Sequence, residues 1–310
     1  MPNSVACVVV TNVSPVYENP FCLSARIFVL TLLAMIAFAS NSLLCRAALK
    51  HTSIDAASFT LVRIFSGAVA LWFIVNVRRI IGAASDIRLG GNWISALALF
   101  FYAAAFSFAY VDVAAGTGAL LLFGAVQTTM ILWGLHKGEH LRAIQIVGLI
   151  VAVTGFVVLL FPGLSAPPLF GSMLMLGAGV AWGIYSLRGK AEKHPATATA
   201  GNFARAVPFA AAVSVIFVPW LHLDFVGVTY AIISGAITSG LGYVIWYSAL
   251  SGLKAASAAA VQLSVPVLTA TGGILLLGEP LTLRYLCASV AILGGIAFVV
   301  FEKTRGCADL

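Results

Sequence analysis

Charged side chains are scarce in this sequence. Only 9% of its 310 residues are Asp, Glu, Lys or Arg, whereas 61% are hydrophobic. A water-soluble domain carries roughly 25% charged residues, which it needs to cover its surface. The composition therefore excludes an ordinary soluble protein and predicts a chain whose main solvent is lipid.

Several chemical motifs are also missing. The five cysteines have no paired spacing and form no CxxC, so the sequence predicts neither a disulfide framework nor a zinc site. The five histidines fall in or beside polar breaks and form no HExxH motif. We therefore expect no bound metal and no cofactor. A Walker motif is absent as well, which leaves ATP-driven activity unsupported.

Basic residues outnumber acidic ones, 17 to 10, but they form no patch. They occur singly or in pairs between long apolar runs, as the anchors that flank membrane spans do. The expected partners are therefore the lipid bilayer and a small-molecule substrate, with no nucleic acid, and we expect a monomer.

Ten apolar stretches remain when the chain is divided at its polar and Gly/Pro clusters. Each is close to the ~20 residues that a helix needs to cross the hydrocarbon. Each is also about twice the length of a membrane β-strand and lacks its alternation. The sequence therefore predicts an all-α membrane protein with ten transmembrane helices, near 25–46, 56–77, 93–111, 114–135, 142–161, 169–188, 199–220, 226–249, 255–277 and 283–302.

Lys and Arg are unevenly shared between the segments that join these spans. With the N-terminus inside, twelve lie on the cytoplasmic side, and only Arg46, Lys50 and Arg284 lie on the other. Basic residues favour the cytoplasmic side. The distribution predicts a multi-pass protein of the cell inner membrane with both termini cytoplasmic, including the tails 1–24 and 304–310.

The chain repeats itself at an offset of 140 residues. Gly138-Glu139 follows the fourth span and Gly278-Glu279 follows the ninth, and further matches keep the same order. The repeats would be residues 25–165 and 166–303. Because each holds five helices, an odd number, the second must enter the membrane from the opposite side. Inverted repeats are typical of secondary transporters with a midplane site and alternating access.

These halves resemble a known family. Each ends in Gly-Glu-x-Leu and a glycine-containing apolar helix, while Phe38-Ala39-Ser40-Asn41-Ser42 and Ala181-Trp182-Gly183-Ile184-Tyr185 are similar to its first-helix motifs. Phe38 stands where tryptophan is usual. Over residues 25–303 the chain resembles the drug/metabolite transporter superfamily, in its EamA-like branch. Its aromatic content is most similar to the aromatic amino acid exporters of that branch.

Amide and aromatic side chains inside the spans are the candidate site. An unpaired amide in an apolar medium costs several kcal/mol, so each should face a wet cavity or, alternatively, bond a neighbouring helix for ~0.6 kcal/mol. Deep tyrosines and tryptophans need partners for their polar tips, whereas Tyr110 and Trp220 are assigned to the lipid–water interface. The predicted substrate-binding residues are Asn41, Tyr102, Gln127, Trp182, Tyr185, Tyr243, Trp246 and Gln262.

Two arginines, Arg63 and Arg205, lie within spans about two turns from a helix start. Their position favours a structural role, in which the side chain snorkels to a carbonyl or a lipid phosphate. The alternative is binding of a substrate carboxylate, which a guanidinium fork matches well.

Acidic residues all lie at helix ends or in loops. We expect Glu139 and Glu279 to cap the start of the next helix. No carboxylate lies deep in a span, so proton coupling through a membrane acid is unsupported, and facilitated diffusion or exchange fits better.

A cavity of amides and aromatics suits a small, net-neutral amphipathic solute. The sequence predicts a transporter of such metabolites, amino acids including aromatic ones, by export or facilitated diffusion. The alternatives are a channel, which needs a continuous polar pore, and an intramembrane enzyme. Ser234 and Ser239 lie in the eighth span, but no histidine at membrane depth activates either, so we expect no enzyme.

Overall fold

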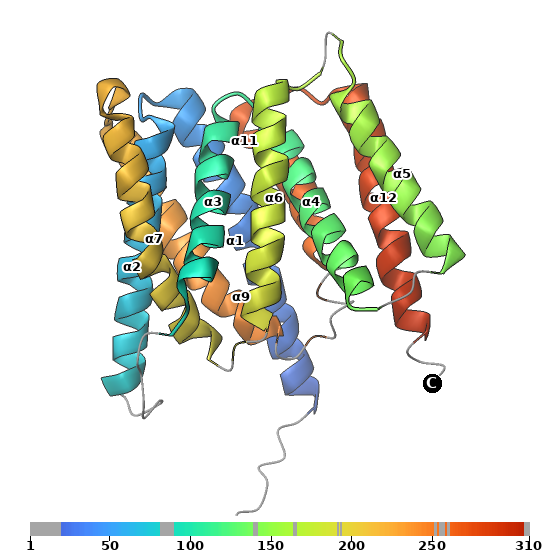
Figure 1. The fold of residues 1–310 in the computed structure, drawn as a ribbon, viewed down its shortest axis with the longest axis horizontal. Helices are drawn as coiled ribbons and strands as arrows, with labels where there is room; N and C mark the ends of the chain where they lie inside the picture. Colours follow the sequence, from blue (N-terminus) through green and yellow to red (C-terminus); the bar gives the residue numbers. More distant parts are fainter. Residues whose placement is uncertain are drawn as a thin grey trace, which may run out of the picture.

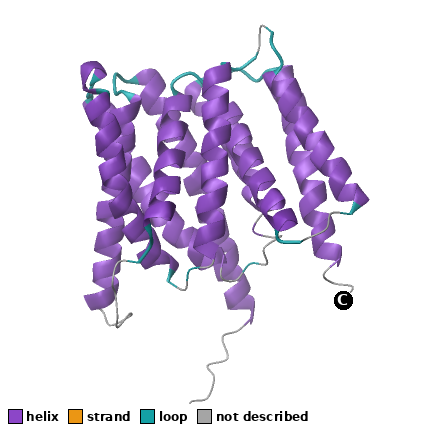
Figure 2. Ribbon diagram, in the orientation of Figure 1, coloured by secondary structure: helices purple, strands orange, loops and turns teal. Residues whose placement is uncertain are grey.

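The computed structural model describes residues 20–80, 90–138, 142–163, 166–190, 192, 194–250, 253, 258 and 261–306. Within these ranges all regular structure is helical (Figure 2). The helices are α1 (Pro20–His51), α2 (Ala56–Ile80), α3 (Trp93–Tyr110), α4 (Ala115–His136), α5 (Ala143–Leu160), α6 (Leu169–Lys190), α7 (Pro195–Ile216), the short η1 (Val218–Trp220), α8 (Phe225–Ile233), the π-helix η2 (Ser234–Leu241), α9 (Gly242–Leu250), α11 (Ser264–Leu277) and α12 (Leu283–Gly306).

The chain is a multi-pass membrane protein. Among the described residues, eight helical stretches are long and apolar enough to cross a bilayer, and Ser264–Leu277 and Leu283–Phe298 are shorter apolar helices. The outward face of α5 carries exposed Val147, Ile150 and Val157, an apolar surface that suits lipid rather than water. The predicted ninth span, 255–277, lies partly outside the described residues, so the count of ten stays a prediction.

The predicted spans and the helices differ most in the second half. The seventh span is predicted at 199–220, but α7 ends at Ile216 and Val218–Trp220 forms a separate 3₁₀ turn that contains Pro219. The eighth, predicted as one regular helix over 226–249, is continuous over Phe225–Leu250 but widens to a π-helix in its middle. The π segment SGAITSGL is rich in small residues, which tolerate a wider turn.

The glycines of the two Gly-Glu pairs lie at helix ends, as the repeat suggests. Gly278 has φ 62° at the end of α11, and Gly138 has φ 89° after α4. A residue with positive φ closes a helix most cheaply when it is glycine. The backbone N–H of Glu279 then bonds the carbonyl of Gly273 at 3.1 Å.

The helices form a bundle with a separate pair at one side. In Figure 1, α5 and α12 lie against each other at the right of the bundle, and the start of α1 and the end of α12 point to the same end. In the remainder, α6 packs on α3 and α4, α1 packs on α9 and α11, and α2 packs on α7 and η2. The centre of the bundle therefore lies between α1, α2, α3, α6 and the α8–η2–α9 span.

Candidate functional site

The centre of the bundle holds a cluster of aromatic and polar side chains around a small cavity. The cavity measures about 10 Å³, close to the space of one water molecule. Its walls come from α1, α3, α4, α6 and α9, so both halves of the chain contribute. The residues that line it are Phe38, Asn41, Ser42, Tyr102, Phe106, Leu122, Phe123, Trp182 and Tyr243.

Trp182 of α6 is the hub of the aromatic contacts. Its ring centroid lies 4.8 Å from that of Tyr102 and 4.8 Å from that of Tyr243. Phe38 of α1 meets Trp182 edge-on at 6.1 Å and Trp246 at 5.9 Å. Tilted and edge-to-face rings at these distances attract one another, and together they form a cage that could enclose an apolar group.

Asn41 is the hub of the polar contacts. Its amide oxygen accepts hydrogen bonds from the hydroxyls of Ser234 at 2.7 Å and Thr238 at 3.1 Å, both on η2. Its amide nitrogen donates to the Tyr102 hydroxyl at 3.3 Å. The carbonyl of this amide is therefore already satisfied, and the network joins α1, α3 and η2.

Arg63 of α2 lies beside this network and is 2% exposed. Its Nη2 donates to the Tyr102 hydroxyl at 3.0 Å and its Nε donates to the Ser239 hydroxyl at 3.3 Å. Its Nη1 is buried with no hydrogen-bond partner. The guanidinium carbon lies 4.8 Å from the ring centre of Phe106 and 5.3 Å from that of Tyr102, within cation–π range.

The prediction of snorkelling arginines is wrong for Arg63 and confirmed for Arg205. Arg205 is half-buried, and its Nη1 donates to the carbonyl of Gly90 at 2.7 Å. Arg63 instead lies on the face of α2 that packs against η2 and points inward. Both arginines lie about two to three turns into their helices, and they occupy faces with different neighbours.

The π-helix brings Ser234, Thr238 and Ser239 to the centre, and Gly235 makes this possible. A Cβ at Gly235 would collide with the backbone carbonyl of Arg63 and the hydroxyl of Ser66, and one at Gly67 would lie 2.6 Å from the Phe203 ring. The backbones of α2 and η2 therefore touch. This close approach carries the Ser239 hydroxyl to Arg63.

The eight predicted site residues fall into three groups, all of them buried. Four line the central cavity: Asn41, Tyr102, Trp182 and Tyr243. Tyr185 and Trp246 adjoin it, since the Tyr185 ring lies 5.5 Å from Trp182 and Trp246 meets Phe38. Gln127, in α4, and Gln262, ahead of α11, are not among the residues that line it.

Other central residues are absent from that prediction: Phe38, Phe106, Ser234, Thr238 and Ser239. Phe38 belongs to the first-helix motif, where tryptophan is usual, whereas Phe106 carries no signal beyond its apolar character. The serines are visible in the sequence as polar residues within an apolar span, but the π-helix that turns them inward is not. Among the described residues no three His, Cys, Asp or Glu side chains gather to hold a metal ion.

A second polar network closes one end of the bundle. The Arg46 Nη1 donates to the carbonyls of Tyr110 at 2.8 Å and Val111 at 2.6 Å, and its Nε lies 3.2 Å from Glu279 Oε1. The other oxygen of Glu279 accepts from the backbone N–H of Ala115 at 2.8 Å. One ion pair thus fastens α1, the α3–α4 turn and the segment between α11 and α12.

This network corrects two predictions. Tyr110 does not lie at the lipid–water interface, since it is 0% exposed and its hydroxyl donates to the Ala115 carbonyl at 3.3 Å. Glu279 caps α4, not the next helix. Helix α12 begins four residues later and is capped by the hydroxyl of Thr282, which accepts from the Tyr285 N–H at 3.1 Å. Glu139 lies outside the described residues.

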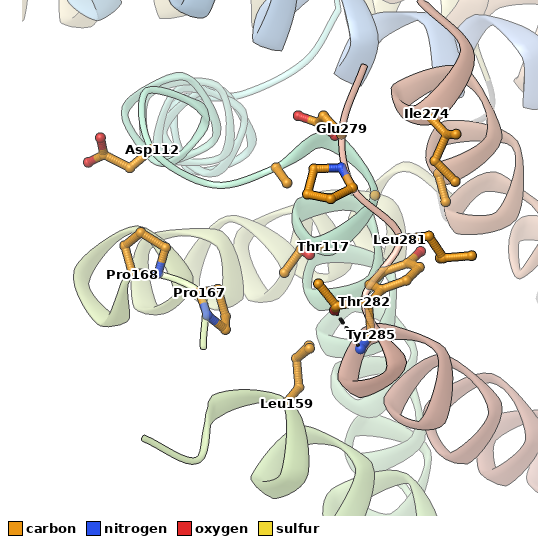
Figure 3. A pocket seen from close by; sticks show the side chains of 14 residues that line it. Asp112, Thr117, Leu159, Pro167, Pro168, Ile274, Glu279, Leu281, Thr282 and Tyr285 are labelled. Carbon is orange, nitrogen blue, oxygen red and sulfur yellow. Dashed lines mark hydrogen bonds between the residues drawn. The ribbon is translucent and has the colours of Figure 1, made fainter. Parts of the chain in front are cut away.

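A wider pocket of about 170 Å³ opens beside Glu279 (Figure 3). Figure 3 shows that Glu279 and Tyr285 of the second half line this pocket together with Thr117 and Leu159 of the first. The pocket lies at the helix ends and is bordered by Pro167, Pro168 and Pro280. It shares no lining residue with the central cavity, and we take the central cluster, where aromatic and hydrogen-bonded polar side chains converge, as the candidate substrate site.

Comparison with known proteins identifies the family. A model of the EamA-like transporter family matches residues 169–301. An uncharacterized transporter of Bacillus subtilis, YoaV, is 23% identical over 80% of this chain and 88% of its own length. The chain belongs to the EamA-like transporter family.

Other proteins are also similar to this EamA-like chain. The uncharacterized protein PA1977 of Pseudomonas aeruginosa is 56% identical over 90% of the chain and 96% of its own length. The threonine/homoserine exporter RhtA of Salmonella typhimurium is 30% identical, and the match spans 53% of this chain and 58% of RhtA. A solved structure, titled "Crystal structure of protein", has a TM-score of 0.61 at 15% identity over 89% of this chain and 97% of that one, which shows the fold alone.

Proposed function

We propose that this EamA-like protein is a secondary transporter of small amphipathic metabolites, with amino acids, aromatic ones included, among its solutes. The observation that carries the proposal is the central cluster. It combines an aromatic cage around Trp182 with a hydrogen-bonded network around Asn41, and its walls come from both halves of the chain. Such a site offers ring faces to an apolar group and polar groups to a charged head.

Alternating access between two inverted five-helix repeats is the proposed mechanism. It is supported by helix contacts that have counterparts in the other half. Helix α3 packs on α6 as α9 packs on α1, and α4 packs on α6 as α11 packs on α1. Exchange of two similar halves supplies two similar states, each open to one side.

The transport direction that we favour is export. RhtA, to which about half of the chain is similar, is a threonine/homoserine exporter by its name. A channel is less well supported, because the central cavity is only about 10 Å³ and forms no continuous polar pore. Helices must move before a solute can enter.

We expect both termini to face the cytoplasm of an inner membrane, because of the distribution of Lys and Arg. Reporter fusions at residues 83, 165 and 278 should then read inside, outside and outside. Residues 83 and 165 lie outside the described ranges, but α2 ends on the side where α1 starts, and α5 and α11 end opposite (Figure 1). A fusion at 83 that reads outside would contradict this orientation.

Counterflow in liposomes tests the function. Vesicles loaded with phenylalanine should accumulate labelled phenylalanine, and the rate should saturate with concentration because a carrier binds its solute each cycle. Trp182→Ala removes the hub of the cage and should lower the rate at least ten-fold. Val151→Ala, on the outward face of α5, is the control and should not change it. Uptake that rises linearly without counterflow would indicate a channel.

A further inference from the structure

We propose that Arg63 is the anchor for the carboxylate of the transported solute, an inference that rests on the proposed transport function. The solute class then differs from the net-neutral amphipath that the sequence predicts. It is a small carboxylic acid that carries an aromatic or other apolar group. The carboxylate is the required head group, and an ammonium group is dispensable.

Comparison of the protein's own buried arginines distinguishes a binding role from a structural one. Arg46 makes bonds to two backbone carbonyls and to the carboxylate of Glu279. Arg205 donates to a carbonyl at 2.7 Å. Arg63, the most deeply buried, has only two hydroxyl partners and no carboxylate among the described residues.

The unsatisfied part of Arg63 suits an anion. Its Nη1 is buried without a partner, and buried polar groups of native proteins are almost always hydrogen-bonded. A cation inside the bilayer is costly and marks functional sites when it lacks a fixed counter-ion. A carboxylate would accept from Nη1 in a charge-assisted bond and would neutralise the site.

The surroundings of the guanidinium suit an apolar group next to that carboxylate. Tyr102 and Phe106, on whose rings the guanidinium lies, both line the central cavity. Trp182 and Tyr243 form the next wall, with the Trp182 ring 4.8 Å from that of Tyr102. A ring attached by a short chain to a carboxylate would therefore span from Arg63 into the aromatic cage once the cavity opens.

The lining of the central cavity offers no charged partner for an ammonium group. No acidic side chain lines the central cavity, and the Asn41 carbonyl already accepts two hydrogen bonds. An amino acid would bind through its carboxylate, and its ammonium would meet only ring faces and uncharged hydroxyls such as those of Ser42 and Tyr243. Removing the ammonium should therefore cost little, whereas removing the carboxylate should abolish the anchor.

Binding of four phenyl compounds to the full chain in nanodiscs tests this difference. Phenylalanine carries both head groups, 3-phenylpropionate the carboxylate alone, 2-phenylethylamine the ammonium alone and 3-phenylpropanol neither. At pH 7, calorimetric titration should give similar dissociation constants for the two carboxylates. The amine and the alcohol should bind at least ten-fold more weakly, equivalent to about 1.4 kcal/mol. Absence of 3-phenylpropionate binding, or a difference below ten-fold, would overturn the inference.

Variants locate the anchor. Arg63→Gln should weaken 3-phenylpropionate at least ten-fold and leave the weak binding of 3-phenylpropanol unchanged, whereas the control Arg205→Gln should bind both as the wild type does. If folded Arg63→Gln loses less than ten-fold in affinity for 3-phenylpropionate, a group other than Arg63 binds the carboxylate. If Arg63→Gln does not fold, Arg63→Lys replaces it. This variant keeps the charge but not the guanidinium fork, so it should bind 3-phenylpropionate more tightly than 3-phenylpropanol by a smaller factor than the wild type does. The ranking of the four compounds on the wild-type protein tests the inference without any variant.

The same compounds separate failure of the inference from failure of the proposed function. Carboxylate binding that depends on Arg63, without counterflow in liposomes, would support the anchor and reject transport. Counterflow of all four compounds at equal rates would support transport and reject the anchor.

Discussion

Glu279→Ala is expected to lower the stability of the folded protein by about 3–5 kcal/mol, the usual effect of removing one partner of a buried ion pair. Glu279 is 7% exposed and Arg46 is 8% exposed, so the guanidinium would lose its counter-ion without gaining full access to water. The N–H of Ala115 at the start of α4 would also lose its acceptor. The melting temperature of the purified protein in detergent measures the effect.

Two further variants give this experiment its control. Arg46→Met with Glu279→Met removes both charges and should recover part of the loss, because a buried pair can often be replaced by apolar residues. Asp112→Asn changes an exposed carboxylate that lines the 170 Å³ pocket beside Glu279. It should change the free energy of unfolding by less than about 0.5 kcal/mol. A Glu279→Ala protein as stable as the wild type would show that the pair does not hold this end of the bundle together.

Gly235→Ala should destabilise the protein by about 1–3 kcal/mol through overpacking. The added methyl group would collide with the backbone carbonyl of Arg63, which cannot rotate away as a side chain could. The helices α2 and η2 would have to separate, and the Ser239 hydroxyl would withdraw from Arg63. Melting temperature and binding of 3-phenylpropionate should therefore fall together.

Gly177→Ala is the matched control for that change. Gly177 lies within α6, and a Cβ there would meet nothing within 4 Å. The substitution should be neutral or stabilise the helix by up to about 1 kcal/mol, because alanine has the higher helix propensity. Equal losses from Gly235→Ala and Gly177→Ala would mean that the contact between α2 and η2 is not the cause.

Much of the fold could be predicted from the sequence because each membrane helix is an apolar stretch bounded by polar residues. The stretch predicted at 93–111 is helix Trp93–Tyr110, and that at 169–188 lies within Leu169–Lys190. The predicted seventh span is displaced, since hydrophobicity alone does not distinguish the end of α7 from the turn that contains Pro219. The length and hydrophobicity of a stretch predict that a helix forms, whereas the residue at which the helix ends also depends on packing.

The candidate site was only partly predictable, because the direction in which a side chain points within the bundle depends on how neighbouring helices pack. Asn41 and Tyr102 follow from the cost of an unpaired polar group in lipid. Arg63 and Arg205 both lie within predicted apolar spans, yet one lies in the centre and the other bonds the carbonyl of Gly90, just before α3. The partner of Glu279 lies 164 residues away at Ala115, and no local pattern indicates it.

The pairing of Arg46 with Glu279 also has a consequence for the order of assembly. The two residues are 233 positions apart, and at roughly 5–20 residues per second synthesis of that interval takes about 10 to 50 s. During this time Arg46 has been made and its counter-ion has not. Arg46 therefore cannot gain its full set of partners until the segment between α11 and α12 has been made. Truncation before residue 279 leaves its guanidinium bonded only to the carbonyls of Tyr110 and Val111.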